Sequence, residues 1–198
     1  MRIADLPHPD TAATRAAEEV LDRYAAPALA HHARRSWLWA AAIGDRLGLP
    51  YDAELLRVGA LLHDLGLEEP FDSHRMSFEQ AGGEVAWVFA AGAGWPAGRR
   101  DRLAAVIVAH MAASTDPERE PEGHLLRLST GLDIAGSGYR ELDPELRAEV
   151  LAALPRLDLA DRFGACFTDQ ARRKPDSSAA ASVRRGVLPA LAANPLEG

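Results

Sequence analysis

The sequence predicts an all-α protein, built as a single bundle of about seven to nine helices. Apolar residues recur at the i, i+3, i+4, i+7 spacing of a helix with one buried stripe, as at Leu55, Val58, Gly59 and Leu62. Prolines and glycines separate such stretches, and no stretch alternates apolar and polar residues as a strand would. Hydrophobic residues make up 47% of the 198 residues, which is enough for one substantial core.

Proline and glycine positions divide the first half of the chain into four expected helices. After a lead-in, Pro27 ends the first helix and Gly48-Leu49-Pro50 ends the second. Gly66 stops the third helix, at a position where a left-handed residue is common. A capping pattern at Ser77 opens the fourth, and Gly82-Gly83 inside it predicts a close helix–helix or backbone–ligand approach. We expect these helices over about residues 11–24, 28–47, 52–64 and 77–91.

The second half of the chain contains the remaining helices. Pro96 prevents a continuous helix before the fifth, Gly136 ends the sixth, Asp143-Pro144 opens the seventh and Lys174-Pro175 closes the eighth. We expect these helices over about 98–112, 122–136, from 143 onward, over about 158–173, and in the alanine-rich stretch after 175. The chain then divides into an N-terminal lead-in and helix (1–27), a main domain (28–175) and a C-terminal helical tail (176–198).

Composition and charge exclude several classes of protein. The formal net charge is −7 and arginine pairs such as Arg34-Arg35 are scattered, which does not indicate a nucleic-acid surface. A single cysteine, Cys166, excludes a disulfide framework and a cysteine zinc cluster. No apolar run approaches the ~20 residues of a membrane span, and the N-terminus lacks a signal core. We therefore expect a cytoplasmic protein with a small-molecule substrate and no nucleic-acid or membrane partner. Whether it forms a homo-oligomer stays open.

An adjacent His63-Asp64 pair lies at the end of an apolar helix. Burying an imidazole beside a carboxylate is costly unless something compensates both. For this pair alone, a hydrogen bond that caps a core helix explains the burial as well as a functional site does. However, His32, His110 and Asp133 lie on the buried faces of three other helices, and each adds a desolvation cost. A divalent metal held by imidazoles and carboxylates resolves these costs, and zinc, iron and manganese suit such ligands.

The order His, His-Asp, His, Asp on successive helices resembles the HD-domain superfamily of metal-dependent hydrolases, and most closely the branch that contains cyanamide hydratase. The similarity covers about residues 28–175, most of the chain. The segments that carry it are His32-Ala33-Arg34-Arg35-Ser36-Trp37, Leu61 to Gly66, Arg75 to Gly83, and Asp133 to Gly136. The resemblance implies an HD-domain helical bundle that acts as a metal-dependent hydrolase or hydro-lyase.

The resemblance also implies roles for individual residues. The ligands of one divalent ion, zinc first with iron or manganese as alternatives, would be His32, His63, Asp64 and Asp133. His110 would face the site and, with Asp64, act in catalysis. The residues expected to contact substrate are Arg35, His74, Arg75 and Glu79. Arg35 and Glu79 could equally form a buried ion pair between two helices, and His31 is expected to be structural or exposed.

Departures from the family pattern bear on the substrate and on the number of metals. After Lys174-Pro175 the cyanamide hydratases continue with a Trp and a His-Thr-Thr segment, whereas this chain has Asp176-Ser177-Ser178-Ala179. Leu67 stands where many phosphodiesterase-type relatives have a lysine. The related diiron oxygenases need two further histidines, and His74 and His110 lie too far apart in the sequence for this. A second metal is therefore not expected.

Three functions follow from these observations as hypotheses. The leading one is a mononuclear metal enzyme that adds metal-activated water to a small substrate, of the cyanamide or nitrile hydration type, with His110 or a nearby carboxylate moving the proton. The alternative is a phosphohydrolase acting on a nucleotide or other phosphomonoester, with Arg35 or Arg75 binding the phosphate. The third is a helical binding protein in which a closed metal site is a structural staple.

Overall fold

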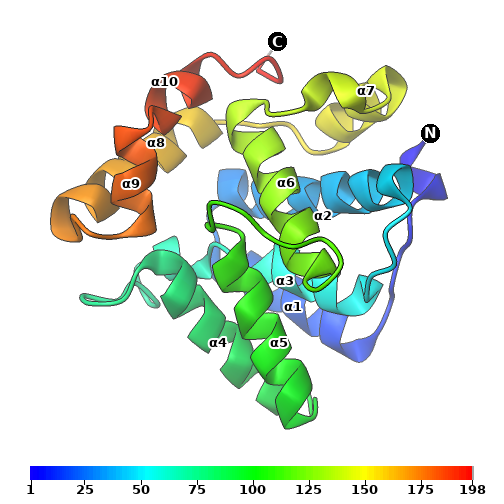
Figure 1. Cartoon of the computed structure of the whole chain (residues 1–198), viewed down its shortest axis with the longest axis horizontal. Coiled ribbons are helices and arrows are strands. Elements are labelled where there is room, and N and C mark those ends of the chain that lie inside the picture. Colours follow the sequence, from blue (N-terminus) through cyan, green and yellow to red (C-terminus); the bar gives the residue numbers. More distant parts are fainter. Residues whose placement is uncertain (198) are drawn as a thin grey trace.

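The structure, a computed structural model that describes residues 1–197, confirms the all-helical fold (Figure 1). The described residues form ten α-helices and three short 3₁₀ turns, and no strand. The α-helices are α1 (Ala12–Tyr24), α2 (Pro27–Leu47), α3 (Ala53–Leu62), α4 (Phe78–Gly92), α5 (Ala97–Ala109), α6 (Pro121–Ala135), α7 (Pro144–Ala153), α8 (Leu159–Arg173), α9 (Ser178–Arg184) and α10 (Val187–Ala192). This number is above the predicted seven to nine because the alanine-rich tail holds two short helices, separated by Gly186.

Local sequence signals explain where the helices begin and end. The side chain of Asp52 accepts a hydrogen bond from the Leu55 amide at 3.0 Å and so caps the start of α3. Gly48 and Gly136 end α2 and α6 with φ angles of +63° and +70°, in the left-handed region that glycine adopts most readily. Both glycines end helices where the sequence predicted a helix to end.

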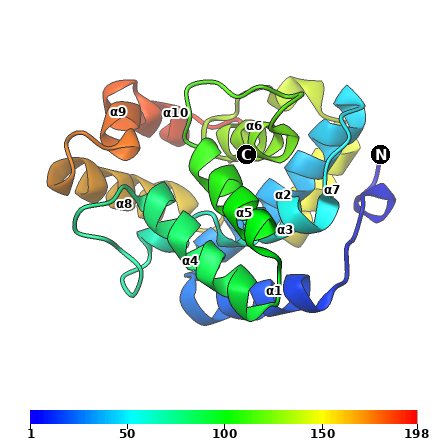
Figure 2. The ribbon, with the colours of Figure 1, turned by 60° about the horizontal axis from the view of Figure 1, so that its bottom comes forward.

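The arrangement of the helices brings the segments with histidine and aspartate residues together. Helix α2 packs against α3 and α6, and α4 runs beside α5 (Figure 1). Helices α8, α9 and α10 gather at one end of the molecule, and the rotated view keeps them there (Figure 2). The buried apolar side chains form a large cluster around α1 to α7 and a smaller one that includes Phe78, Phe163, Phe167 and Leu191.

The turn after α3 is held by a close approach of α4. Gly66 does not have a positive φ, so the expectation of a left-handed glycine here is wrong. Glycine is needed for another reason: a Cβ atom on Gly66 would overlap the carbonyl oxygen of Phe78 at the start of α4. A Cβ atom on Gly82 would lie 3.0 Å from the carbonyl oxygen of His63, which confirms the close approach predicted for the glycine pair. The His63 turn is therefore fixed by backbone packing.

The C-terminal tail packs onto the bundle. Helix α9 contacts α8, and α10 contacts both α6 and α8. The Asn194 side chain donates a hydrogen bond to the backbone carbonyl of Asp133 at 2.8 Å. The tail therefore contacts the helix that carries Asp133, one of the predicted site residues. None of the described helices combines the length and the hydropathy that a membrane span requires.

Candidate metal centre

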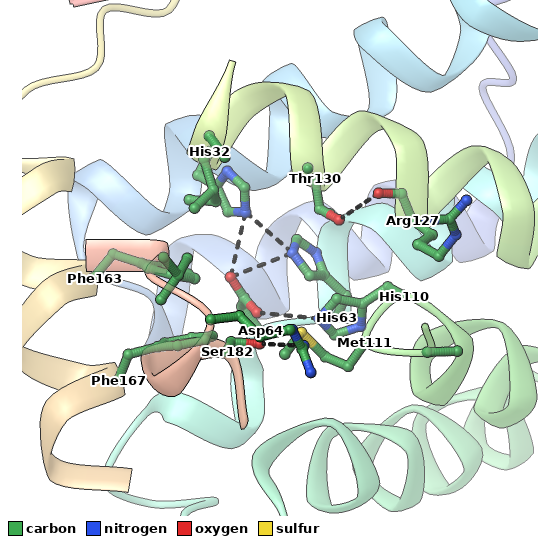
Figure 3. Close-up of a pocket in the computed structure, with 16 residues that line it drawn as sticks. His32, His63, Asp64, His110, Met111, Arg127, Thr130, Phe163, Phe167 and Ser182 are labelled. Carbon is green, nitrogen blue, oxygen red and sulfur yellow. Dashed lines mark hydrogen bonds and ion pairs between the residues drawn. The ribbon is translucent and has the colours of Figure 1, made fainter. Parts of the chain in front are cut away.

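Three buried donor atoms converge between α2 and the end of α3 (Figure 3). The Nε2 atom of His32 lies 3.2 Å from Nε2 of His63 and 3.4 Å from Oδ2 of Asp64. The distance from Nε2 of His63 to the same Oδ2 atom is 3.3 Å. Among the described residues, these three side chains form a group with the spacing of a metal site. The structure thus brings three of the four predicted ligands together.

Hydrogen bonds behind the two histidines determine which nitrogen faces the other donors. Nδ1 of His32 donates to Oδ2 of Asp133 at 2.7 Å, and Nδ1 of His63 donates to the Ala60 carbonyl at 2.8 Å. In the neutral imidazoles both Nε2 atoms therefore lack a proton and present lone pairs. Three lone pairs that face one another repel unless a cation lies among them, so the donor set is built for positive charge.

The pKa values of the group also favour a bound cation. Burial disfavours the charged form of His32, but the hydrogen bond to Asp133 and the nearby carboxylate of Asp64 outweigh burial and raise the pKa of His32 above its ordinary value. Burial likewise opposes ionisation of Asp64, yet the adjacent His63 and His32 hold the pKa of this carboxyl well below its usual range. Oδ2 of Asp64 is buried and lacks a hydrogen-bond partner among the described residues. An orphaned carboxylate oxygen is what a metal ligand looks like without its ion.

The spacing of the donors fits a divalent metal. Ligands held at ~2.0–2.1 Å from a tetrahedral ion lie roughly 3.3 Å from one another. The three observed separations, 3.2, 3.3 and 3.4 Å, match that value. Three protein ligands leave one tetrahedral position for water or substrate, which is the pattern of catalytic zinc sites.

Asp133 lies behind His32, outside the three-donor group. Its carboxylate accepts four hydrogen bonds: one from His32, two from Arg35 at 2.8 Å each, and one from the Trp39 indole at 2.8 Å. Burial opposes its ionisation, but the Arg35 guanidinium and His32 hold the pKa of Asp133 far below its usual range. This placement differs from the predicted role as a direct ligand, because the oxygens of Asp133 are already engaged. Asp133 orients the His32 ring.

Arg35 does not reach the substrate region. Its fully buried guanidinium binds Asp133 and donates to the carbonyls of Leu154 and Pro155 at 3.0 and 3.1 Å. The alternative pairing of Arg35 with Glu79 is also not observed, since Glu79 accepts a hydrogen bond from Ser178 at 2.7 Å. Both expectations for Arg35 are therefore corrected: its partner is Asp133.

His74, Arg75 and Glu79 line a separate hollow of about 370 Å³, together with the Arg173 to Ser178 segment. None of the three lines the cavity beside the converging donors. In their part of the sequence it is Phe78 that faces His110, with ring centroids 5.6 Å apart. The structure therefore does not place His74, Arg75 and Glu79 beside the converging donors, where substrate contacts were predicted for them.

His110 follows α5 and faces the three-donor group, as expected. Its Nδ1 donates to the Ile107 carbonyl, and its Nε2 lies 3.9 Å from Oδ1 of Asp64. Burial, with a further contribution from His63, lowers the pKa of His110 to about 3. The ring is therefore neutral at pH 7 and offers an Nε2 lone pair. By contrast, His31 is half-buried and bonds the Pro155 carbonyl, away from the group.

A cavity of about 210 Å³ lies beside the donors, and His32, His63 and Asp64 line part of it. One wall is apolar and contains Phe163 and Phe167, whose rings stack with centroids 4.2 Å apart. Helix α6 forms another wall. It presents Arg127, Thr130, Gly131 and Ile134, at the i, i+3, i+4, i+7 spacing of one helix face. This face is different from the one that carries Asp133.

Two arginines in this cavity were not identified from the sequence. Arg127 could have been found, because its helical spacing to Thr130 and Ile134 indicates a common face. Arg185 follows α9 and reaches the cavity because the tail packs onto the bundle. No local signal in the sequence reports that long-range contact.

The family model of the HD domain matches residues 29–163, well over half of the chain. The chain belongs to the HD domain family. The matched region contains His32, His63, Asp64, His110 and Asp133. Members of this family are generally metal-dependent hydrolases, and the His-His-Asp group is the site at which this chain could bind the ion. No curated protein matches the chain in sequence.

Proposed function

We propose that this HD-domain protein is a metal-dependent hydrolase that adds activated water to a small molecule in the cavity. The observation that carries this proposal is the triangle of Nε2 of His32, Nε2 of His63 and Oδ2 of Asp64, with sides of 3.2 to 3.4 Å. The triangle borders an open cavity, which supports a catalytic site over a closed structural one. Zinc is the proposed ion because of the imidazole ligands, with iron or manganese as alternatives.

In this proposal His32, His63 and Asp64 hold the ion, which when bound lowers the pKa of a coordinated water toward ~7 and polarises the substrate. Asp133 and Arg35 keep His32 in the orientation that presents Nε2. His110 is neutral and hydrogen-bonded at Nδ1, so its Nε2 accepts a proton from water and returns it to the product. Phe163 and Phe167 exclude bulk water on one side.

Hydration of cyanamide or another nitrile is the first reaction to test. The motifs around His32 and from Leu61 to Gly66, which resemble those of cyanamide hydratases, support it. Water would add across the carbon–nitrogen triple bond, its oxygen bonding to carbon and its protons passing to nitrogen, with no leaving group. His110 would carry the proton between the two atoms.

Hydrolysis of a phosphomonoester is the second candidate, and one observation favours it. The arginines named in the sequence analysis, Arg35 and Arg75, do not line the cavity, but Arg127 and Arg185 do. Guanidinium groups suit phosphate oxygens because their donors are arranged as a planar fork. Water would replace the alkoxy group on phosphorus, and the leaving oxygen would take up the proton.

Turnover assays on the metal-reconstituted protein test the proposal. Cyanamide, small nitriles and nucleoside monophosphates should be supplied in parallel, with zinc, iron or manganese. We expect turnover of at least one substrate that disappears in His63→Ala and after chelation. Metal bound tightly with no turnover of any of these compounds would instead support the structural-staple alternative.

A further inference from the structure

The tail of the chain supplies part of the wall of the cavity. Three residues from α9 and the start of α10 line the same cavity as His32, His63 and Asp64: Ser182, Arg185 and Val187. Figure 3 shows Ser182 near the donors. These tail residues lie beyond residue 163, where the HD-domain match ends. This wall is therefore a feature of this chain, outside the part that it shares with the family model.

The tail is attached at both ends of its two helices. Near its start, Ser178 donates a hydrogen bond to Glu79 at 2.7 Å, and Ser177 caps α9 by accepting from the Ala180 amide at 3.2 Å. Near its end, Asn194 donates to the Asp133 carbonyl at 2.8 Å. Arg185 is therefore presented by an anchored segment.

Two arginines that line the cavity, Arg127 and Arg185, have no carboxylate partner among the residues that the structure describes. Nε of Arg127 donates to the Thr115 hydroxyl at 3.2 Å, and Nη2 of Arg185 donates to the Ser182 hydroxyl at 3.1 Å. Both partners are neutral, and within residues 1–197 neither arginine forms an ion pair. The fully buried Arg35 does have a carboxylate partner, Asp133 at 2.8 Å, whereas Arg127 is half-buried and Arg185 is exposed. The two cavity arginines thus keep donors and positive charge available in a protein whose net charge is −7.

We infer that Arg127 and Arg185 are specificity-determining residues that bind an oxyanion group of the substrate, either phosphate or carboxylate. They reach the cavity from separate elements, α6 and the α9–α10 turn, and each guanidinium can donate two parallel hydrogen bonds to an oxyanion. A neutral substrate would leave the half-buried Arg127 guanidinium without a charged partner. The inference rests on the proposed function, because the same cavity holds the His-His-Asp group and thus the reacting end of the substrate.

Calorimetric titration with inorganic phosphate and with acetate tests this inference, and propionitrile serves as a neutral comparison. The variants are Arg127→Gln and Arg185→Gln. The matched control is Arg184→Gln, since Arg184 is exposed, bonds the Pro175 carbonyl and does not line the cavity. We expect at least one oxyanion to bind about tenfold or more weakly to each cavity variant, while the control binds as the wild type does. Tighter binding of phosphate than acetate would assign a phosphorylated substrate, and the reverse a carboxylate.

Metal-free and metal-reconstituted protein should be titrated separately. The loss caused by Arg127→Gln and Arg185→Gln should occur in both, with metal content and melting temperature unchanged. Equal oxyanion affinity in wild type and cavity variants would overturn the inference, and so would a wild type that binds neither oxyanion. Failure of the proposed function looks different: arginine-dependent binding would persist in the metal-free protein, while no metal-dependent turnover is found.

Discussion

Nδ1 of His32 and Oδ2 of Asp133 lie 2.7 Å apart, and this hydrogen bond links the candidate metal centre to the core of the protein. On its far side Asp133 accepts hydrogen bonds from Arg35 and Trp39, both fully buried. The carboxylate therefore fixes the tautomer of His32 and directs Nε2 toward the other donors. Such hydrogen bonds behind a ligand typically contribute about 10–100-fold to metal affinity.

Asp133→Asn should weaken metal binding by about 10–100-fold while leaving one metal per chain at saturating metal. It should also lower the free energy of unfolding by about 3–5 kcal/mol, because Arg35 would keep a buried charge without its carboxylate. Chelator competition and urea denaturation measure the two effects. Asp143→Asn is the control: asparagine still caps α7, and only an ion pair near the surface with the N-terminus is lost, so metal affinity should not change and the free energy of unfolding should fall far less than in Asp133→Asn. A complete loss of metal from Asp133→Asn would show that Asp133 is a ligand after all.

His110→Gln should retain metal and lose about 10²–10⁴-fold in kcat, the usual contribution of a positioned acid–base group. The reason is that Nε2 of His110 faces Asp64 across 3.9 Å at the edge of the cavity. His74→Gln is the matched control, since His74 lines a different hollow, and its kcat should equal that of the wild type. Metal analysis and kinetics on both variants check this. If His110→Gln loses its metal along with activity, His110 is a ligand.

The helical pattern allowed most of the fold and the centre of the site to be predicted. Inward positions on α2 and the end of α3 identify His32, His63 and Asp64, because a buried polar residue on an apolar stripe is visible in the sequence. The same pattern cannot separate a ligand from the residue that orients it. Asp133 is buried on the correct helix, but only its contacts with Arg35 and Trp39 show that its oxygens are engaged.

The substrate side of the cavity was harder to predict. Arg75 and His74 follow the His-Asp motif closely in sequence, yet the chain turns so that Phe78 is the residue that meets His110. Arg185 lies 121 positions after Asp64 and reaches the same cavity through tail packing. Contacts of this kind depend on how helices dock against one another, which residue periodicity does not encode.

The stability of the metal-free protein should depend on pH through His110, whose folded pKa is lowered from 6.5 to about 3. Between these pH values His110 binds a proton in the unfolded chain but not in the folded chain. The free energy of unfolding therefore falls as the pH is lowered through this window. The limiting slope is about 1.4 kcal/mol per pH unit. Denaturation of wild type and His110→Gln from pH 7 to pH 5 measures it: the stability of the wild type relative to the variant should decrease. A constant difference would mean that His110 is not buried in neutral form.

Gly66→Ala should destabilise the protein by about 2–4 kcal/mol, because the added Cβ atom would overlap the Phe78 carbonyl oxygen. The displaced turn carries His63 and Asp64, so metal affinity should fall as well. Gly98→Ala is the control: it lies in the first turn of α5, where an added Cβ atom would meet open space, and it should be neutral or stabilise slightly. Thermal unfolding compares the two substitutions. Equal melting temperatures would refute the close approach of α4.

Metal content per chain tests the central claim most directly. Elemental analysis should be made on purified wild type, His32→Ala, His63→Ala and His31→Ala after reconstitution with zinc. His31 is adjacent to His32 but bonds the Pro155 carbonyl, so it controls for the loss of a histidine from the same helix. We predict one metal per chain in the wild type and in His31→Ala, and none in His32→Ala or His63→Ala. Retention of about one metal per chain in either of the last two variants would contradict the account.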